Sequence, residues 1–161
     1  MSLVIDTLRA SPITEELSDA EVEILSELFE VQEFKAGDVI VKPNDEQPDN
    51  LYMLASGDIE VRIESAAEKA VIHVLKPGDL AGMITFAGGA ASQISATLYA
   101  VGPTKVLSMQ RLRFESLLNS HPRLVYHVMR GIIRNMHGIV RRVNSESAEL
   151  SNYIYKTGGR Y

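Results

Sequence analysis

Apolar residues near the N-terminus recur with the period of an α-helix. Four of them share one helical face, at Val22, Leu25, Leu28 and Phe29. Ser18 followed by Glu21 is the arrangement of a capping box, in which two side chains satisfy free amide groups of the first helical turn. The pattern therefore predicts a helix that begins after Ser18 and ends before Glu33.

From Val31 to Ser108 the period shortens to that of β-strands. Short runs rich in Val, Ile and Tyr, which favour strands, are "VQEF", "DVIV", "NLYMLA", "IEVRI", "VIHVL", "ATLYAV" and "KVLSM". Glycine-containing turns separate several of them, and Gly37, Gly57 and Gly78 lie 20 and then 21 residues apart. This spacing predicts a β-sandwich or barrel, and strand pairs of this length suit a jelly roll. A β-helix is disfavoured because the segments share no repeated side-chain ladder.

A long helix is predicted to close the chain, with Pro122 at its first position, where the missing N–H costs nothing. Residues four and three apart form a heptad seam, namely Val125, Met129, Ile132, Met136, Ile139, Val143, Glu146, Leu150 and Tyr153. A helix of about 30 residues spans roughly 45 Å, which is longer than a small β-domain can cover. We expect part of the seam to pack on the β-core and the rest on a second copy of the chain. The predicted homodimer contacts are Met129, Ile132, Met136, Ile139 and Val143. The alternative is a helix wholly buried on its own domain.

These elements predict a mainly β fold with flanking helices, organised as one domain over residues 1–161. Its parts are an N-terminal helical segment (1–30), a β-roll (31–110) and C-terminal helices (111–155).

Composition narrows the classes of function. The chain has no cysteine, which excludes disulfides, thiolate metal sites and thiol chemistry. It has no apolar run near the roughly 20 residues of a membrane span and no secretory signal, so we expect a cytoplasmic protein. The net charge is −5, but residues 111–142 contain seven arginines and only one carboxylate, that of Glu115. This segment is either a phosphate-contacting surface or, as we favour, a solvated face that balances the acidic N-terminal half.

Three passages carry a family resemblance. They are "FKAGDVIVKPNDEQPDNLYMLASGDIEV" (Phe34–Val61), "LKPGDLAG" (Leu75–Gly82) and "SATLYA" (Ser95–Ala100). In this order and spacing, between a leading helix and a long closing helix, they resemble the cyclic nucleotide-binding domain family. Its members are the sensor halves of catabolite-activator-type regulators and of cyclic-nucleotide-dependent kinases and channels. The resemblance covers nearly the whole chain and implies a double-stranded β-helix (jelly roll) with a long C-terminal dimerisation helix.

The resemblance also implies a phosphate-binding cassette, but its polar residues are replaced. In the family, a glutamate after the cassette glycine binds the ribose hydroxyl and an arginine pairs with the phosphate. Here the glycine is Gly82, Met83 follows it, and the arginine position falls on Ile94. No arginine occurs between residues 63 and 110, so no shift of alignment supplies one.

The long helix departs from the family as well, because a Thr–Ser pair that contacts the purine in catabolite-activator-type proteins corresponds to Ile139 and Val140. Losing one partner of a buried charge pair costs about 2–5 kcal/mol. We therefore expect weak binding of ordinary cyclic nucleotides. Three alternatives follow: a more apolar small ligand, a vestigial pocket filled by the protein itself, or a weakened nucleotide site. The candidate ligand-binding residues are Gly82, Met83, Ile84, Ser92, Gln93, Ile94, Ser95, Thr97 and Ile139.

Other chemistry has little support. The four histidines form no His-x-His or His-x-x-x-His pair, and only His73 lies on a predicted strand, so we expect no metal site, no cofactor and no catalysis. The family's transcription regulators continue into a helix-turn-helix domain, whereas this chain ends at Tyr161, so we expect no DNA-binding module. The leading hypothesis is a ligand-sensing regulatory module that signals through a dimer helix to a partner protein. The competing hypotheses are a true cyclic AMP or cyclic GMP receptor, a constitutive dimerisation scaffold and a cupin-like enzyme.

Overall fold

The computed structural model describes residues 2–42, 49–64, 69–88 and 96–158. Its helices are α1 (Leu3–Arg9), the 3-10 helix η1 (Pro12–Thr14), α2 (Asp19–Ser26), α3 (Met83–Phe86), α4 (Arg111–Glu115) and α5 (Pro122–Gly158). Its strands are β1 (Glu30–Phe34), β2 (Val39–Val41), β3 (Asn50–Ser56), β4 (Ile59–Glu64), β5 (Lys69–Leu75), β6 (Leu80–Ala81), β7 (Ala96–Ala100) and β8 (Thr104–Gln110).

Helix α2 begins as the sequence predicts. The Ser18 side chain accepts a hydrogen bond from the Glu21 amide, and the Glu21 carboxylate accepts one from the Ser18 amide, so the capping box is confirmed. The helix ends at Ser26, earlier than the apolar pattern indicates. The reason is that Phe29 reaches the core, with 7% of its surface exposed, from the turn that leads into β1.

The strands form two antiparallel four-stranded sheets, as expected for a β-roll. One sheet has the order β1-β8-β3-β6 and the other the order β2-β7-β4-β5. Gly37, Gly57 and Gly78 have positive φ in the turns that the sequence predicts. Strand β6 is only two residues long and was not predicted, since so short a strand leaves no alternation to read.

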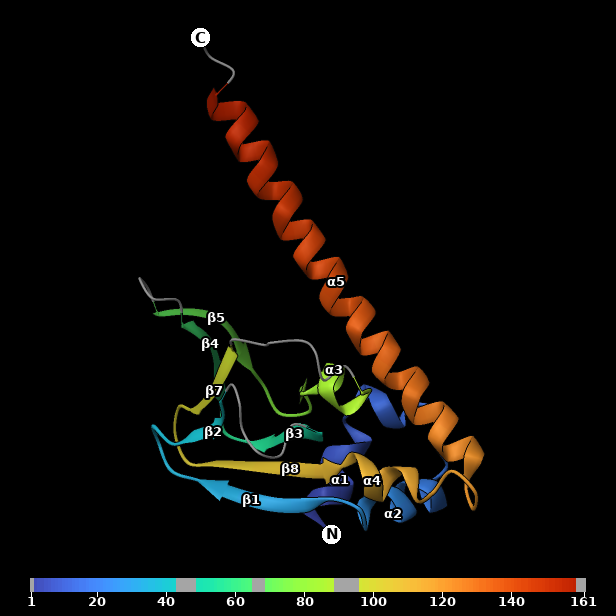
Figure 1. The fold of residues 1–161 in the computed structure, drawn as a ribbon. Helices are drawn as coiled ribbons and strands as arrows, with labels where there is room; N and C mark the ends of the chain where they lie inside the picture. Colours follow the sequence, from blue (N-terminus) through green and yellow to red (C-terminus); the bar gives the residue numbers. More distant parts are fainter. Residues whose placement is uncertain (1, 43–48, 65–68, 89–95, 159–161) are drawn as a thin grey trace.

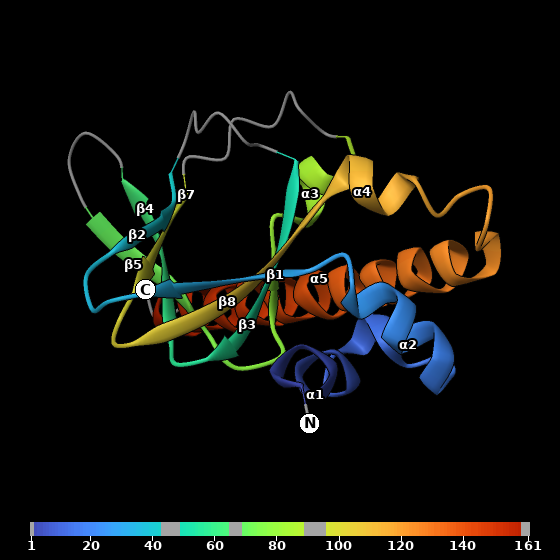
Figure 2. The ribbon, with the colours of Figure 1, turned by 90° about the horizontal axis from the view of Figure 1, so that it is seen from below.

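The helices gather at one end of the roll, and both views place the sheet of β2, β4, β5 and β7 at the other end (Figures 1 and 2). The larger apolar core lies between the helices and the first sheet, and it includes Leu25, Met53, Leu107, Phe114 and Val128. A smaller core lies inside the roll and consists of Leu54, Ile59, Leu75, Leu98 and Val106.

Helix α5 is 37 residues long and has two different halves. Its first half lies along the body, while its second half runs away from it (Figure 1). Val125 and Ile132 are 7% and 2% exposed and belong to the larger core, whereas residues 140–149 are all exposed. Ile132, predicted as a dimer contact, is therefore a core residue of its own chain.

Candidate ligand cleft

At the start of the predicted cassette, the backbone adopts a conformation that requires glycine. Gly82 has a φ of 78°, which a side chain disfavours, and a Cβ there would lie 2.6 Å from the carbonyl oxygen of Asn50. The amide of Phe86 then donates to the carbonyl of Gly82, which closes the single turn of α3. Only glycine therefore fits where β6 passes into α3.

The cassette residues fall into two groups. Met83, at the position of the family's glutamate, is half-buried and packs against the larger core, so its thioether fills space within the protein. The side chain of Ile84 and the whole of residues 92–95, which include Ser92, Gln93, Ile94 and Ser95, lie outside the described residues. The ligand contacts predicted for those residues stay predictions.

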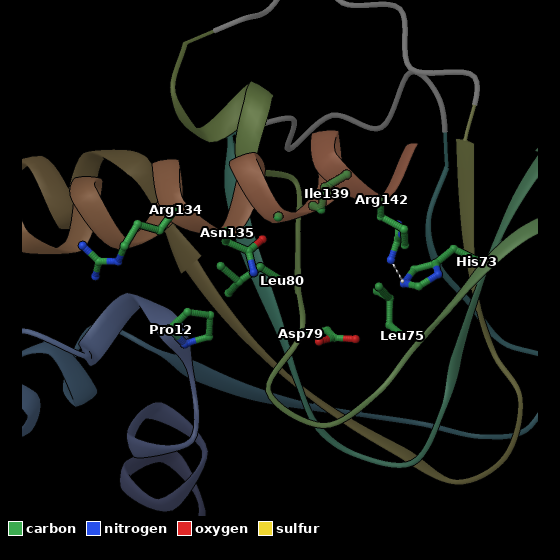
Figure 3. A pocket seen from close by; sticks show the side chains of 10 residues that line it. Pro12, His73, Leu75, Asp79, Leu80, Arg134, Asn135, Ile139 and Arg142 are labelled. Carbon is green, nitrogen blue, oxygen red and sulfur yellow. Dashed lines mark hydrogen bonds between the residues drawn. The ribbon is translucent and has the colours of Figure 1, made fainter. Parts of the chain in front are cut away.

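A cavity of about 370 Å³ lies between α5 and strand β5 (Figure 3). We call it the cleft, and its lining residues are Pro12, His73, Leu75, Asp79, Leu80, Arg134, Asn135, Gly138, Ile139 and Arg142. This volume lies within the range of roughly 300–1,000 Å³ that is usual for small-molecule sites.

The cleft has an apolar wall and a polar end. Leu75 and Leu80 are 7% and 5% exposed and face Ile139 of α5, which is half-buried. At the polar end, a terminal guanidinium nitrogen of Arg142 lies 3.3 Å from Nε2 of His73, so α5 and β5 touch through this pair (Figure 3). A small ligand with both apolar and polar parts would match this lining.

Asp79 adds a carboxylate to the lining, but the turn before β6 holds one of its oxygens. Its Oδ2 accepts a hydrogen bond of 2.9 Å from the amide of Lys76, and the Lys76 ammonium pairs with Asp58 at 3.0 Å. Asn135 points from α5 toward the same space (Figure 3). The cleft thus offers hydrogen-bonding groups along its floor as well as at the Arg142 end.

The N-terminal segment closes the other end of the cleft by packing η1 on α5. Gly131 makes this possible, because a Cβ there would lie 2.5 Å from the Cα of Ile13 and 2.9 Å from the carbonyl oxygen of Pro12. The two backbones therefore touch, and Pro12 is brought into the lining of the cleft.

Four charged residues, which we call the ionic clamp, surround this contact: Glu15, Glu16, Arg130 and Arg134. Arg130 Nε lies 2.9 Å from Glu16 Oε1, Arg134 Nε lies 3.2 Å from Glu15 Oε2, and Arg134 also bonds Glu16. The hydrogen bond from Arg130 lowers the pKa of Glu16, with Arg134 acting in the same direction. The hydrogen bond with Glu16 in turn raises the pKa of Arg130. Arg134 points away from the cleft toward these partners (Figure 3).

Among the predicted ligand-binding residues whose side chains the structure describes, Ile139 alone lines the cleft. Thr97 is 4% exposed on β7 and is not among the lining residues. Sequence reasoning missed His73 and Arg142; local spacing places each beside a lining residue of its own element but does not bring the two together. Residues two apart on a strand share a face, which places His73 beside Leu75, and residues three apart on a helix are neighbours, which places Arg142 beside Ile139.

Comparison with known proteins identifies the family. Residues 31–121 match the family described as "Cyclic nucleotide-binding domain". The chain belongs to this family. A cyclic nucleotide-binding domain from Methylobacillus flagellatus has the same fold, with a TM-score of 0.76 at 16% identity over 89% of this chain and 80% of that one. The N-terminal domain of a transcriptional regulator from Streptomyces coelicolor gives a TM-score of 0.69 at 21% identity over 83% and 94%.

Two curated proteins share sequence with this family member over part of their length. The HTH-type transcriptional regulator Cmr of Mycobacterium tuberculosis is 31% identical over 110 residues, which are 63% of this chain and 41% of that protein. Lysophospholipase nte1 of Aspergillus fumigatus is 31% identical over 119 residues, 73% of this chain and 8% of that protein. The chain thus spans less than half the length of either relative.

No group of three or more histidine and carboxylate side chains in the described ranges is placed to hold a metal ion. No helix in those ranges is long and apolar enough to cross a membrane.

Proposed function

We propose that this cyclic nucleotide-binding domain is a ligand-sensing regulatory module whose ligand occupies the cleft between β5 and α5. One observation carries the proposal: the cleft has the β-roll as one wall and α5 as the other. A molecule bound there touches both, so its binding energy depends on where α5 lies relative to the roll. A ligand that binds the two placements with different affinity shifts the population between them.

Helix α5 is suited to pass such a change outward. Beyond Arg142, which contacts His73, the helix runs away from the body, while its first half touches η1, the cleft and the larger core (Figure 1). A small rotation about the first half therefore becomes a larger displacement at the far end. In this proposal the receiver is a second copy of the chain and, through it, a partner protein.

The proposed dimer surface is a row of exposed apolar residues on α5 that we call the outer stripe: Tyr126, Ile133, Val140 and Val143, which are 58%, 63%, 52% and 51% exposed. With Met129 and Met136, both packed partly against the core, they follow the alternating steps of three and four of a heptad seam. The outer stripe replaces the contact predicted at Ile132.

We propose further that the ligand is not an ordinary cyclic nucleotide. Met83 packs inward at the position of the family's glutamate, and no arginine occurs in the cassette sequence. The loss of a charge partner of a phosphate, about 2–5 kcal/mol, corresponds to roughly 30- to several-thousand-fold in affinity.

Titration of the purified protein with cyclic AMP and cyclic GMP by calorimetry tests this point. We expect no saturation at micromolar concentrations. Native mass spectrometry of gently purified protein is the second arm, and we expect a co-purified small molecule that is lost when Ile139 is replaced by Asp. Micromolar binding of either nucleotide would show that the chain is a true nucleotide receptor. A ligand-free protein that dimerises without any added molecule would favour a constitutive scaffold.

A further inference from the structure

The two arginines that line the cleft, Arg134 and Arg142, have different partners. Arg134 is held by Glu15 and Glu16 and points away from the cavity. In the described part of the chain, the polar partner of Arg142 is an imidazole and not a carboxylate, at 3.3 Å from His73. Among the described residues, no carboxylate therefore offsets the guanidinium of Arg142 at the polar end of the cleft.

Arg142 and His73 can hold an anion together. A guanidinium presents several N–H donors in a plane, and an imidazole presents a ring N–H, so a carboxylate or phosphate oxygen placed between them accepts from both. Without an anion, the contact joins a guanidinium nitrogen to a ring nitrogen at 3.3 Å, with no carboxylate beside them among the described residues. An anion would convert this contact into two charge-assisted hydrogen bonds.

The rest of the lining restricts which anion fits. Leu75 and Leu80 on the wall of the roll and Ile139 on α5 make both walls apolar, which suits a hydrocarbon or aromatic body. Asp79 places a negative charge on the cleft, which disfavours a second anionic group. A polyanion would meet this carboxylate, whereas a molecule with one anionic group at the Arg142 end would not.

We propose that the cleft binds a small amphipathic organic monoanion, with its carboxylate at Arg142 and His73 and its apolar body against Leu75, Leu80 and Ile139. The inference rests on the proposed function and adds the chemical class and the orientation of the ligand. The anionic group then lies on the α5–β5 side of the roll, and no arginine in the cassette is needed to hold it.

The test compares two fluorescent probes of similar aromatic character. The probe 8-anilinonaphthalene-1-sulfonate carries one anionic group, and N-phenyl-1-naphthylamine is neutral. Each is titrated into the parent protein, into Arg142→Gln, and into Arg141→Gln, the matched control. Arg141 is exposed on α5 like its neighbour and does not line the cleft, so the control changes the net charge by the same amount.

We expect Arg142→Gln to weaken binding of the sulfonate about tenfold, the effect of one charge-assisted hydrogen bond. Arg141→Gln should leave it within about twofold, and neither variant should change binding of the neutral probe. Equal losses in both variants would show general attraction to a basic helix and would overturn the inference. An unchanged sulfonate affinity in Arg142→Gln would overturn it as well.

NMR spectra of the Ile139 methyl groups distinguish failure of the anion inference from failure of the proposed function. If the neutral probe shifts them and the sulfonate binds no better, the cleft takes apolar ligands and only the anion inference fails. If neither probe shifts them, the cleft takes no such ligand and both proposals fail. If the sulfonate shifts them in the parent and in Arg141→Gln but not in Arg142→Gln, both are supported.

Discussion

Gly131 allows two segments that lie far apart in the sequence to touch backbone to backbone. Any larger residue would place an atom 2.5 Å from the Cα of Ile13, a separation that real Cβ atoms do not adopt. Because the obstacle is main chain and not a flexible side chain, the conflict is relieved only when η1 moves away from α5. The absence of a side chain at Gly131 thus allows the N-terminal segment to pack on α5 and places Pro12 at the end of the cleft.

The substitution Gly131→Ala tests this contact against a matched control on the same helix. Alanine favours a helix over glycine by about 1 kcal/mol, so Gly138→Ala, where a Cβ meets nothing within 4 Å, should stabilise the protein by about 0.5–1 kcal/mol. Gly131→Ala should instead destabilise it by about 1–3 kcal/mol, because overpacking exceeds the gain in helix propensity. Urea denaturation measures both. Equal stabilisation by the two changes would contradict the backbone contact.

At the scale of elements, α5 has two apolar faces where a single seam was predicted. One face packs Val125 and Ile132 into the core, and the other is the outer stripe. Met129 and Met136 lie between them and pack partly against the core. The predicted seam joined residues from both faces, because apolar spacing shows that a residue is buried but not which surface buries it.

Ile133→Asp tests the outer stripe as a dimer surface. Ile133 is 63% exposed in the single chain, so the fold should persist while a buried charge in the dimer disfavours pairing. We expect sedimentation velocity to show the mass of a monomer for this variant and of a dimer for the parent. The matched control is Ser145→Asp, which adds the same charge to an exposed position on the opposite side of α5 and should remain dimeric. An unchanged mass for Ile133→Asp would exclude this surface.

The sequence was sufficient for most elements, and the reasons for the exceptions are physical. Strand alternation, glycine turns and the Ser18 capping box predicted the roll and the start of α2. The end of α2 was misplaced because Phe29 is buried from a turn. The cleft was missed because it depends on how α5 crosses β5, and no local pattern in either segment records that crossing. His73 and Arg142 therefore became neighbours only through the tertiary fold.

At the scale of the whole molecule, the uneven distribution of charge along the sequence brings the basic C-terminal segment into contact with the acidic N-terminal segment. Arginines of the basic segment 111–142 pair with carboxylates of the first 30 residues, as Arg113 does with Glu30 at 3.3 Å and Arg130 with Glu16 at 2.9 Å. These pairs are largely exposed, so each adds little to stability by itself. The Arg113 pair joins α4 to the start of β1, and the Arg130 pair helps to align the N-terminal segment with α5.

This alignment should weaken in acid. Because its arginine partners lower the pKa of Glu16 below its ordinary value of 4.5, folding favours the ionised form. The stabilising contribution is therefore complete above pH 4.5 and is lost as the pH falls through the lowered folded value. In Glu16→Gln the carboxylate is absent, so the free energy of unfolding should fall less between pH 6 and 3 than in the parent.

Denaturation at several pH values, followed by circular dichroism, measures the difference. The control is Glu23→Gln, an exposed carboxylate of α2 for which the described part of the chain contains no ion pair. It should keep the steeper decline of the parent. Parallel curves for Glu16→Gln and the parent would show that the ionic clamp carries no pH-dependent stability.

The position of Met129 and Met136 has a consequence for how α5 turns about its own axis. Methionine is unbranched and adapts its shape to irregular space, so these side chains keep filling their surroundings when the helix rolls by a few degrees. A β-branched residue in either place would fit one angle only. We therefore expect Met129 and Met136 to let α5 rotate about its own axis by a few degrees. Replacing both by isoleucine should leave a protein that folds but whose α5 keeps one rotational position.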